Sequence, residues 1–343
     1  MKKNYTQRLE KLKKRRLDEN LQKAILTRSF NDVAISESVK YAMEAMSEID
    51  PSYTKNTYQA SENIQSNLTS GLNRFNLEVE YRHQGSIETN THIKIHSDID
   101  ILVFTDKYVS LDPPLTPSSP YKGDPLADLK ELRQKSYEVL NATYNQVDNS
   151  KAKSIQVFPT RPKRKVDVVI CNWLDTPDYE NTSSEVYRGI RVYNKDEHSR
   201  TKDYPFLHIA RVNEKDNFVG GGLRRLVRLL KTLRADADYK IDLSSFEVTS
   251  IIYSMDSSAF AKPVHQQQLL LNEASTHLEK LINNDTYRQT LWSPNGKELV
   301  FGSNNAKIVE LKKMKLELDE LIQDMSEELA RQFKRIDQNI IYS

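Results

Sequence analysis

Three aspartates stand on short apolar segments of this chain, in a pattern that suits divalent-cation chemistry. Asp98 and Asp100 lie two apart at the start of the run Ile99–Phe104, and Asp167 lies within Val166–Ile170. Because alternate side chains of a strand point to the same face, the first two carboxylates share a face. Adjacent carboxylates repel each other unless a cation lies between them, and Mg²⁺ prefers such hard oxygen ligands. Three strand-borne acids can hold two metal ions, the arrangement that stabilises the attacking and leaving oxygens in nucleotidyl transfer.

A glycine–serine pair precedes these aspartates and supplies what a phosphate-binding loop needs. Gly85 lets the backbone approach a phosphate closely, and the Ser86 hydroxyl and nearby backbone N–H groups can donate to phosphate oxygens. A Gly-Ser pair alone is a weak signal. Followed by Asp98-Ile99-Asp100 on an apolar strand and by Asp167 on a later one, it indicates a nucleotide-transfer site and not a surface turn.

These residues need a sheet to hold them, and the hydrophobic periodicity predicts one. Short runs rich in β-branched residues predict strands at 77–81, 98–104, 154–158 and 166–171. Helices are expected at 33–46, 52–75, 126–144, 223–234, 245–253, 264–283 and 305–336, and loops at 113–125 and at Asp236-Ala237-Asp238. The predicted fold class is α+β: a small mixed sheet flanked by helices, followed by a C-terminal helical lobe.

The composition of the chain is that of a globular protein with a hydrated surface. Its 343 residues hold 50 Lys and Arg against 48 Asp and Glu, and this near-neutral balance argues against a surface devoted to nucleic acid. No run approaches 18 consecutive apolar residues, so no membrane span is expected, and no apolar stretch follows the basic start as in a secretory signal. The single cysteine, Cys171, cannot form an internal disulfide, so we expect a cytoplasmic protein.

The charge is uneven along the chain. Residues 1–28 hold ten basic and three acidic side chains, a local charge of +7, and leucines at helical spacing predict an amphipathic helix there. Either its leucines pack while the basic face stays in water, or the arm binds a nucleic acid or a partner protein. We expect three regions: an N-terminal helical region over 1–50, a catalytic core over 51–215, and a helical lobe over 216–343 that closes the nucleotide cleft.

The pattern Gly85-Ser86, Asp98-Ile99-Asp100 and Asp167 resembles the nucleotidyltransferase fold of the polymerase-β superfamily. With four further segments the chain is similar to the cGAS/DncV-like nucleotidyltransferases (CD-NTases) of bacterial anti-phage (CBASS) signalling. These segments are Thr91-His92-Ile93, Phe206-Leu207-His208, the basic helix 223–234 and Leu243-Ser244-Ser245-Phe246-Glu247. The resemblance extends over residues 50–320. One position departs from the family pattern, because Asn90 stands where a glycine often precedes the loop threonine.

The resemblance implies a role for each matching residue of the core. Asp98 and Asp100 would bind two Mg²⁺ ions, with Mn²⁺ as a substitute. Asp167 would bind one of these ions and help to activate the attacking 3′-hydroxyl. Gly85 and Ser86 would cradle the donor triphosphate.

In the helical lobe the resemblance implies three further nucleotide contacts. Lys231 would meet the β- or γ-phosphate, Ser245 would hydrogen-bond a phosphate, and Phe246 would stack on a base. The residues themselves leave a structural alternative open for each. Lys231 lies among arginines on a helix whose charges are solvated or paired, Ser245 suits a helix N-cap, and Phe246 suits a core.

The resemblance implies a Mg²⁺-dependent enzyme that joins ribonucleoside triphosphates, ATP foremost, into a cyclic di- or trinucleotide with release of pyrophosphate. The product would be a second messenger read by a separate effector protein. The alternative is a nucleotidyltransferase that adds nucleotides to RNA or to a protein acceptor, with residues 1–28 as the docking site. The sequence leaves open the bases, the ring size, the linkage and the need for an activating or regulatory protein.

Overall fold

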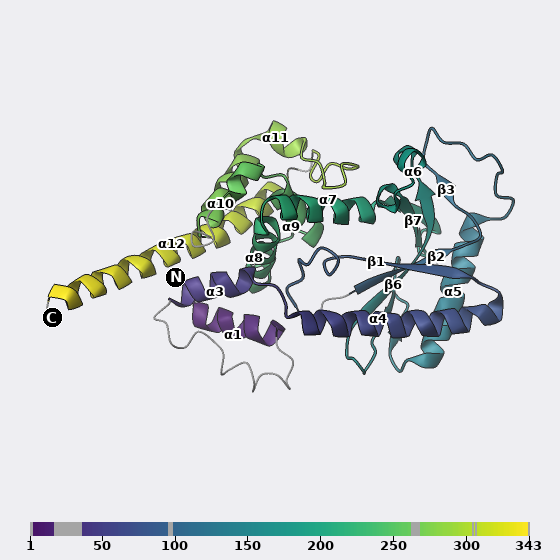
Figure 1. Ribbon diagram of the computed structural model, residues 1–343, viewed down its shortest axis with the longest axis horizontal. Helices are drawn as coiled ribbons and strands as arrows, with labels where there is room; N and C mark the ends of the chain where they lie inside the picture. Colours follow the sequence, from purple (N-terminus) through teal and green to yellow (C-terminus); the bar gives the residue numbers. More distant parts are fainter. Residues whose placement is uncertain are drawn as a thin grey trace. The chain divides into compact units, whose positions relative to one another are not determined.

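The computed structural model describes residues 3–16, 36–94, 99–261, 268–303, 305 and 307–341 (Figure 1). The chain divides into two compact units. The helical unit comprises Met1–Ile49, Thr91–Ile95 and Val212–Ser343, and the sheet unit comprises Asp50–Asn90 and His96–Arg211. The N-terminal segment therefore belongs with the C-terminal helices, and a short stretch between Gly85 and Asp100 also belongs with them.

The sheet unit is built on an eight-stranded mixed sheet with the strand order β1-β2-β6-β5-β4. The second half of β6 also pairs with β3 and β7, and β8 pairs with β7. The strands are β1 Val79–Gln84, β2 Ile99–Thr105, β3 Ser110–Leu111, β4 Val147–Asp148, β5 Ile155–Val157, β6 Val166–Asp175, β7 Gly189–Asn194 and β8 Ser199–Asp203. β2 and β6 run parallel at the centre, whereas β1 pairs with β2 in the antiparallel sense. The four predicted strands are confirmed, and β7 and β8 were missed because charged side chains interrupt their apolar pattern.

Helices α4 (Pro51–Leu72) and α5 (Pro125–Thr143) cover one face of the sheet. Each begins with an Asp-Pro pair: the Asp50 carboxylate accepts from Ser52 N at 2.8 Å, and the Asp124 carboxylate from Leu126 N at 2.9 Å. The aspartate satisfies a free N–H of the first turn, where proline is tolerated. Both helices confirm the sequence prediction.

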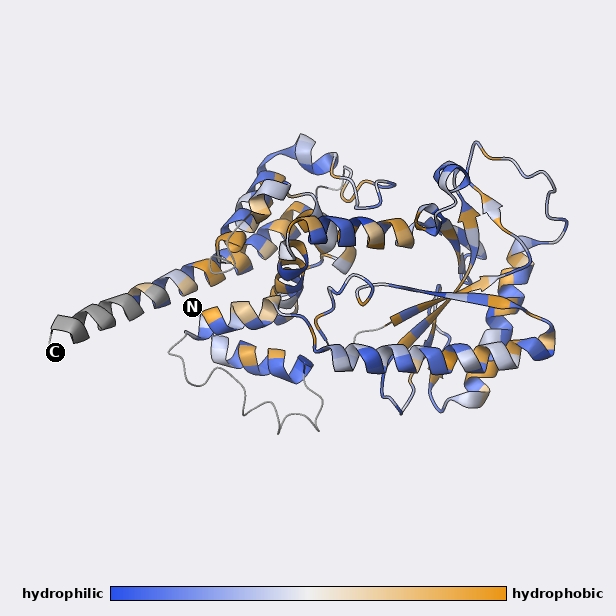
Figure 2. Ribbon diagram, viewed as in Figure 1, coloured by the Kyte–Doolittle hydropathy of each residue, from blue (hydrophilic) through white to orange (hydrophobic). Residues whose placement is uncertain are grey.

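Alternation along β2 and β6 decides which side chains face α4 and α5. The apolar strands carry buried residues on both faces (Figure 2). Ile99, Ile101 and Val103 pack on the side of the two helices, whereas Leu102 and Phe104 pack on the opposite side with Cys171 and Trp173. Because strand side chains alternate, Asp100 and Asp167 lie on this opposite face.

The helical unit packs around α8 (Gly222–Asp236), whose Leu226, Leu229, Leu230 and Leu233 are fully buried. Around it lie α1 (Tyr5–Arg16), α3 (Glu37–Met46), α9 (Ser245–Tyr253), α10 (Gln268–Asn283), α11 (Asp285–Gln289) and α12 (Lys307–Ile341). α7 (Pro205–Phe218), which the sequence analysis did not predict, runs from the sheet unit into the helical unit, and α6 (Pro177–Thr182) belongs to the sheet unit. Short 3₁₀ turns lie at Asn73–Phe75, Glu185–Tyr187 and Ser257–Phe260.

Basic residues of α1 pair with buried acids of the same unit. Arg8 Nη1 lies 2.9 Å from Glu317 Oε2, and Arg15 Nη2 donates to Asp236 Oδ2 at 2.7 Å. Tyr41 also donates to Asp236 at 2.9 Å. The loop predicted over 236–238 is confirmed at Ala237 and Asp238 and wrong at Asp236, which is the last residue of α8 and has a side chain fully buried against Arg15.

The N-terminal arm thus packs within its own unit over the described part, where Leu9 and Leu12 are buried. Residues 17–28 of the predicted basic arm lie outside the described residues. No helix in the described part of the chain is both long and apolar enough to cross a membrane.

Candidate active site

Two of the three predicted metal ligands face each other across the parallel strand pair. In the register of β2 and β6, Asp100 lies opposite Asp167, and both side chains emerge on the face away from α4 and α5. Neighbouring strands are separated by about 5 Å, so the two carboxylates can approach a common ion. Asp98 lies outside the described residues, and its role stays a prediction.

The surroundings of these carboxylates suit a cation. Lys165 Nζ lies 3.1 Å from Asp167 Oδ2, and Ser154 Oγ lies 3.4 Å from Asp167 Oδ1. Gln84 Nε2 lies 3.5 Å from Asp100 Oδ2. The Asp167 side chain is only 14 % exposed and has a cationic partner, as a largely buried carboxylate requires.

This donor set fits Mg²⁺, because Asp100 and Asp167 offer hard carboxylate oxygens from two rigid strands. Among the residues that the structure describes, no group of three metal-ligating side chains is gathered, and the predicted third member, Asp98, is not one of those residues.

The Gly85–Ser86 loop follows β1 directly and lies against Asp100. Gly85 has φ +98°, and a Cβ added there would lie 3.3 Å from Asp100 Oδ2. Both the backbone conformation and the close approach therefore favour glycine. Ile87 anchors the loop in the sheet core, and the Tyr58 hydroxyl donates to Glu88 Oε1 at 2.8 Å.

Asn90, the one departure from the family pattern, adopts the conformation that a glycine would. Its φ is +50°, in the left-handed region. Asparagine tolerates this region better than most residues do, because its short polar side chain can bond locally. The substitution is therefore compatible with the turn that ends the loop.

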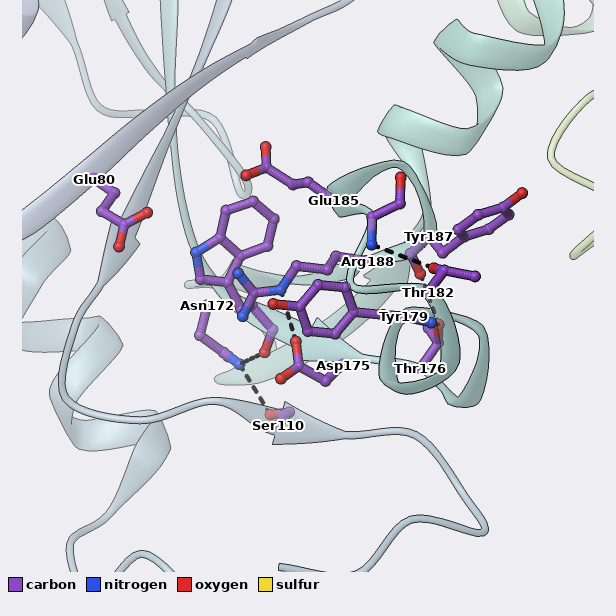
Figure 3. Close-up of polar contacts among 12 residues, drawn as sticks. Glu80, Ser110, Asn172, Asp175, Thr176, Tyr179, Thr182, Glu185, Tyr187 and Arg188 are labelled. Atoms are coloured by element: carbon purple, nitrogen blue, oxygen red, sulfur yellow. Dashed lines mark hydrogen bonds and ion pairs between the residues drawn. The ribbon is translucent and has the colours of Figure 1, made fainter.

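The opposite end of this sheet face is filled by its own side chains (Figure 3). The Arg188 guanidinium lies 4.1 Å from the Trp173 ring centroid and 4.7 Å from that of Tyr179. Arg188 Nε donates to Asp175 Oδ1 at 2.7 Å, and the Trp173 ring stacks on Phe104 at 3.9 Å. Arg188 and Asp175 pair with each other in this cluster, whereas at the other end two carboxylates, Asp100 and Asp167, lie opposite each other, so that end is the candidate site.

In the helical unit, Lys231 is 3 % exposed and contacts a loop residue. Its Nζ donates to both the carbonyl oxygen and the Oγ1 of Thr91, each at 3.1 Å. Burial lowers the pKa of Lys231 to about 7, with smaller contributions from the positive charges of Arg234 and Arg228. The predicted contact of Lys231 with a triphosphate stays a prediction.

The two serines at the start of α9, Ser244 and Ser245, have different roles. Ser244 is the N-cap: its Oγ accepts from Glu247 N at 3.1 Å, and the Glu247 carboxylate accepts from Ser244 N at 2.6 Å. The structural alternative for Ser245, an N-cap, is therefore wrong. Ser245 is exposed and accepts from Arg234 Nη2 at 3.2 Å, and Phe246 is partly exposed and outside the buried core.

Three contacts of the two aspartates were not anticipated. Lys165 stands two residues before Asp167, so strand alternation places both on one face and could have revealed the pair. Gln84 immediately precedes the Gly-Ser pair and could also have been inferred. Ser154 reaches Asp167 through the β5–β6 pairing, for which the sequence holds no local signal.

Comparison with known proteins shows the family of this chain. The family model of the cGAS/DncV-like nucleotidyltransferase C-terminal helical domain matches residues 210–324. A c-di-GMP synthase of Capnocytophaga granulosa is 34 % identical over 92 % of this chain and 96 % of its own length. The chain belongs to the cGAS/DncV-like nucleotidyltransferases. The predictions of this family, of a nucleotidyltransferase and of the fold class are thereby confirmed.

Other CD-NTases cover the same length. A c-di-GMP synthase of Flavobacteriaceae sp. genome_bin_11 is 30 % identical over 95 % of this chain and 98 % of that protein. The solved structure of the STING-associated CdnE c-di-GMP synthase from Capnocytophaga granulosa has a TM-score of 0.81 at 32 % identity, covering 95 % of this chain and 99 % of that one. These full-length matches span both units.

Proposed function

We propose that this CD-NTase condenses two molecules of GTP into cyclic di-GMP and releases two molecules of pyrophosphate. The observation that carries the proposal is the register of Asp100 opposite Asp167, with the Gly85 backbone against the Asp100 carboxylate. Three similar proteins of nearly full-length coverage are named c-di-GMP synthases, which favours GTP over the ATP expected from sequence.

In each step a 3′-oxygen forms a bond to the α-phosphorus of a triphosphate while the bond to the β-phosphate oxygen breaks. Asp98, Asp100 and Asp167 would hold two Mg²⁺ ions, which acidify the attacking hydroxyl and stabilise the leaving pyrophosphate when bound. The Gly85–Ser86 backbone would cradle the donor triphosphate, and Ser245 and Phe246 would contact the nucleotide. The linear intermediate then turns so that its own 3′-hydroxyl closes the ring, and the same residues serve both bonds because positioning supplies much of the catalysis.

The product would act on a separate effector protein in anti-phage defence in the cytoplasm. A STING-associated relative supports this proposal. The alternative of an RNA or protein acceptor docked on the basic arm has less support, because Arg8 and Arg15 pair with acids of their own unit.

The test is to incubate the purified protein with each ribonucleoside triphosphate alone and with all four, in Mg²⁺ or Mn²⁺, and to identify the products by mass spectrometry. We expect phosphatase-resistant cyclic di-GMP from GTP alone, and none from the Asp167→Asn variant. A mixed or adenine-only ring would overturn the choice of GTP, and labelled RNA or protein would overturn cyclisation.

A further inference from the structure

Thr91 carries no role in the chemistry described so far, yet it is among the most completely buried polar residues of the chain. It is 1 % exposed, and the adjacent His92 is 4 % exposed. Asn90 belongs to the sheet unit, and the next described residues, 91–94, belong to the helical unit. Thr91 is thus the point at which the connection from the Gly85–Ser86 loop to β2 is attached to the helical unit.

The attachment consists of Lys231 of α8. Its ammonium donates to two oxygens of the same residue, the backbone carbonyl and the hydroxyl of Thr91, each at 3.1 Å. Both hydrogen bonds are buried, and two acceptors on one residue fix its position. Within the described residues, no carboxylate pairs with Lys231, so the neutral oxygens of Thr91 are its partners.

The burial of this contact bears on what Lys231 can do. Lys231 is only 3 % exposed, and two arginines of α8 are close enough to lower its pKa. A positive charge at this position therefore costs free energy unless hydrogen-bond partners offset the cost. A side chain that only met a phosphate would need no such fixed protein partner. The two hydrogen bonds instead tie α8 to the segment that leads from the Gly85–Ser86 loop into the aspartate-bearing strand.

We propose that Thr91 and Lys231 form a clamp that fixes the loop 86–94 to helix α8, so that Thr91 is a positioning residue for nucleotidyl transfer. Only the kinetic part of the test depends on the proposed function, because kcat and KM are measured with GTP. Loss of the clamp lets the loop open, which lowers the fraction of molecules in which the phosphate-binding backbone and the aspartates are aligned.

The test compares Thr91→Val with Thr91→Ser, Lys231→Met and the Thr91→Val/Lys231→Met double variant. Thr232→Val is the matched control, because Thr232 is a threonine buried to 1 % exposure beside Lys231 on α8. Amide hydrogen exchange of the peptide 86–94 reports opening of the loop, and steady-state pyrophosphate release from GTP gives kcat and KM. Thermal unfolding confirms that each variant is folded.

We expect Thr91→Val to speed exchange in peptide 86–94 and to lower kcat, each about tenfold, with KM within about twofold of the parent. The loss of one partner of a buried hydrogen bond is worth roughly that factor. Thr91→Ser should restore both, and the double variant should be no worse than Lys231→Met, because both substitutions break one contact. Thr232→Val should leave the exchange of that peptide unchanged.

The opposite pattern overturns the clamp: Lys231→Met raises KM without faster exchange, while Thr91→Val changes neither quantity. Lys231 would then act on the nucleotide alone. The exchange measurement needs no turnover, so it tests the clamp even if the parent protein makes a product other than cyclic di-GMP.

Discussion

Replacing Gly85 by alanine tests the link between the phosphate-binding loop and the aspartates. At φ +98° a side chain strains the backbone, which costs about 1–3 kcal/mol for a residue other than glycine. The new Cβ would also lie 3.3 Å from Asp100 Oδ2, tighter than an ordinary van der Waals contact. Because Gly85 itself is exposed, its backbone can relax without unfolding the core, so the penalty falls mainly on the fraction of molecules whose site is aligned. Since 1.4 kcal/mol is a factor of ten, we expect kcat to fall roughly tenfold to a hundredfold.

The assay is pyrophosphate release from GTP, with urea unfolding as the measure of stability. We expect Gly85→Ala to reduce the free energy of unfolding by no more than about 3 kcal/mol while the protein stays folded at 25 °C. The matched control is Asn90→Gly, at the other positive-φ position of the loop, where φ is +50°. It should stay within about 1 kcal/mol of the parent, because glycine adopts this conformation without strain. Parent-like kcat in Gly85→Ala would refute the inference that the Gly85 backbone is part of the site.

Three further predictions follow from buried and capping groups. Ser244→Ala should cost about 1 kcal/mol of stability by removing the N-cap, whereas Ser245→Ala should leave urea unfolding unchanged and weaken binding of a non-hydrolysable GTP analogue; equal stability losses would contradict this. Arg15→Ala should destabilise by roughly 3 kcal/mol, because it leaves buried Asp236 without its cation, while Lys14→Ala, exposed on the same helix, should be neutral. Burial lowers the pKa of Lys231 to about 7, so this side chain is mostly neutral at pH 8, and a contact with a triphosphate would raise its pKa. Calorimetry at pH 8 in buffers of different ionisation enthalpy should therefore show proton uptake when the analogue binds. The Lys231→Met variant should show none. No uptake in the parent would contradict a phosphate contact.

Local chemistry made the core of the site predictable. Alternation along an apolar strand was enough to predict one face for Asp98 and Asp100 and to single out Asp167 on a second strand. The register that sets Asp100 opposite Asp167 comes from the pairing of β2 with β6. The strands β7 and β8 were missed because the apolar residues of β7 are few and interrupted by Arg191, and because β8 carries charged side chains and is held by its pairing with β7.

Long-range contacts could not be predicted from sequence. Asp236 was predicted to lie in a loop because the partners of its carboxylate, Arg15 and Tyr41, lie about two hundred residues away in the chain. For the same reason the pairing of Lys231 with Thr91, 140 residues apart, left no trace in the spacing of residues. The spacing of residues in the sequence indicates which face of a helix or strand a side chain occupies. Its contact partner is decided by the tertiary fold.

The most direct test of the central claim is Mn²⁺ binding in the presence of a non-hydrolysable GTP analogue, followed by electron paramagnetic resonance. If Asp100 and Asp167 act together at one cation site, the parent protein binds Mn²⁺, and Asp100→Asn and Asp167→Asn each lose that binding while remaining folded. Undiminished Mn²⁺ binding in both variants would contradict the account.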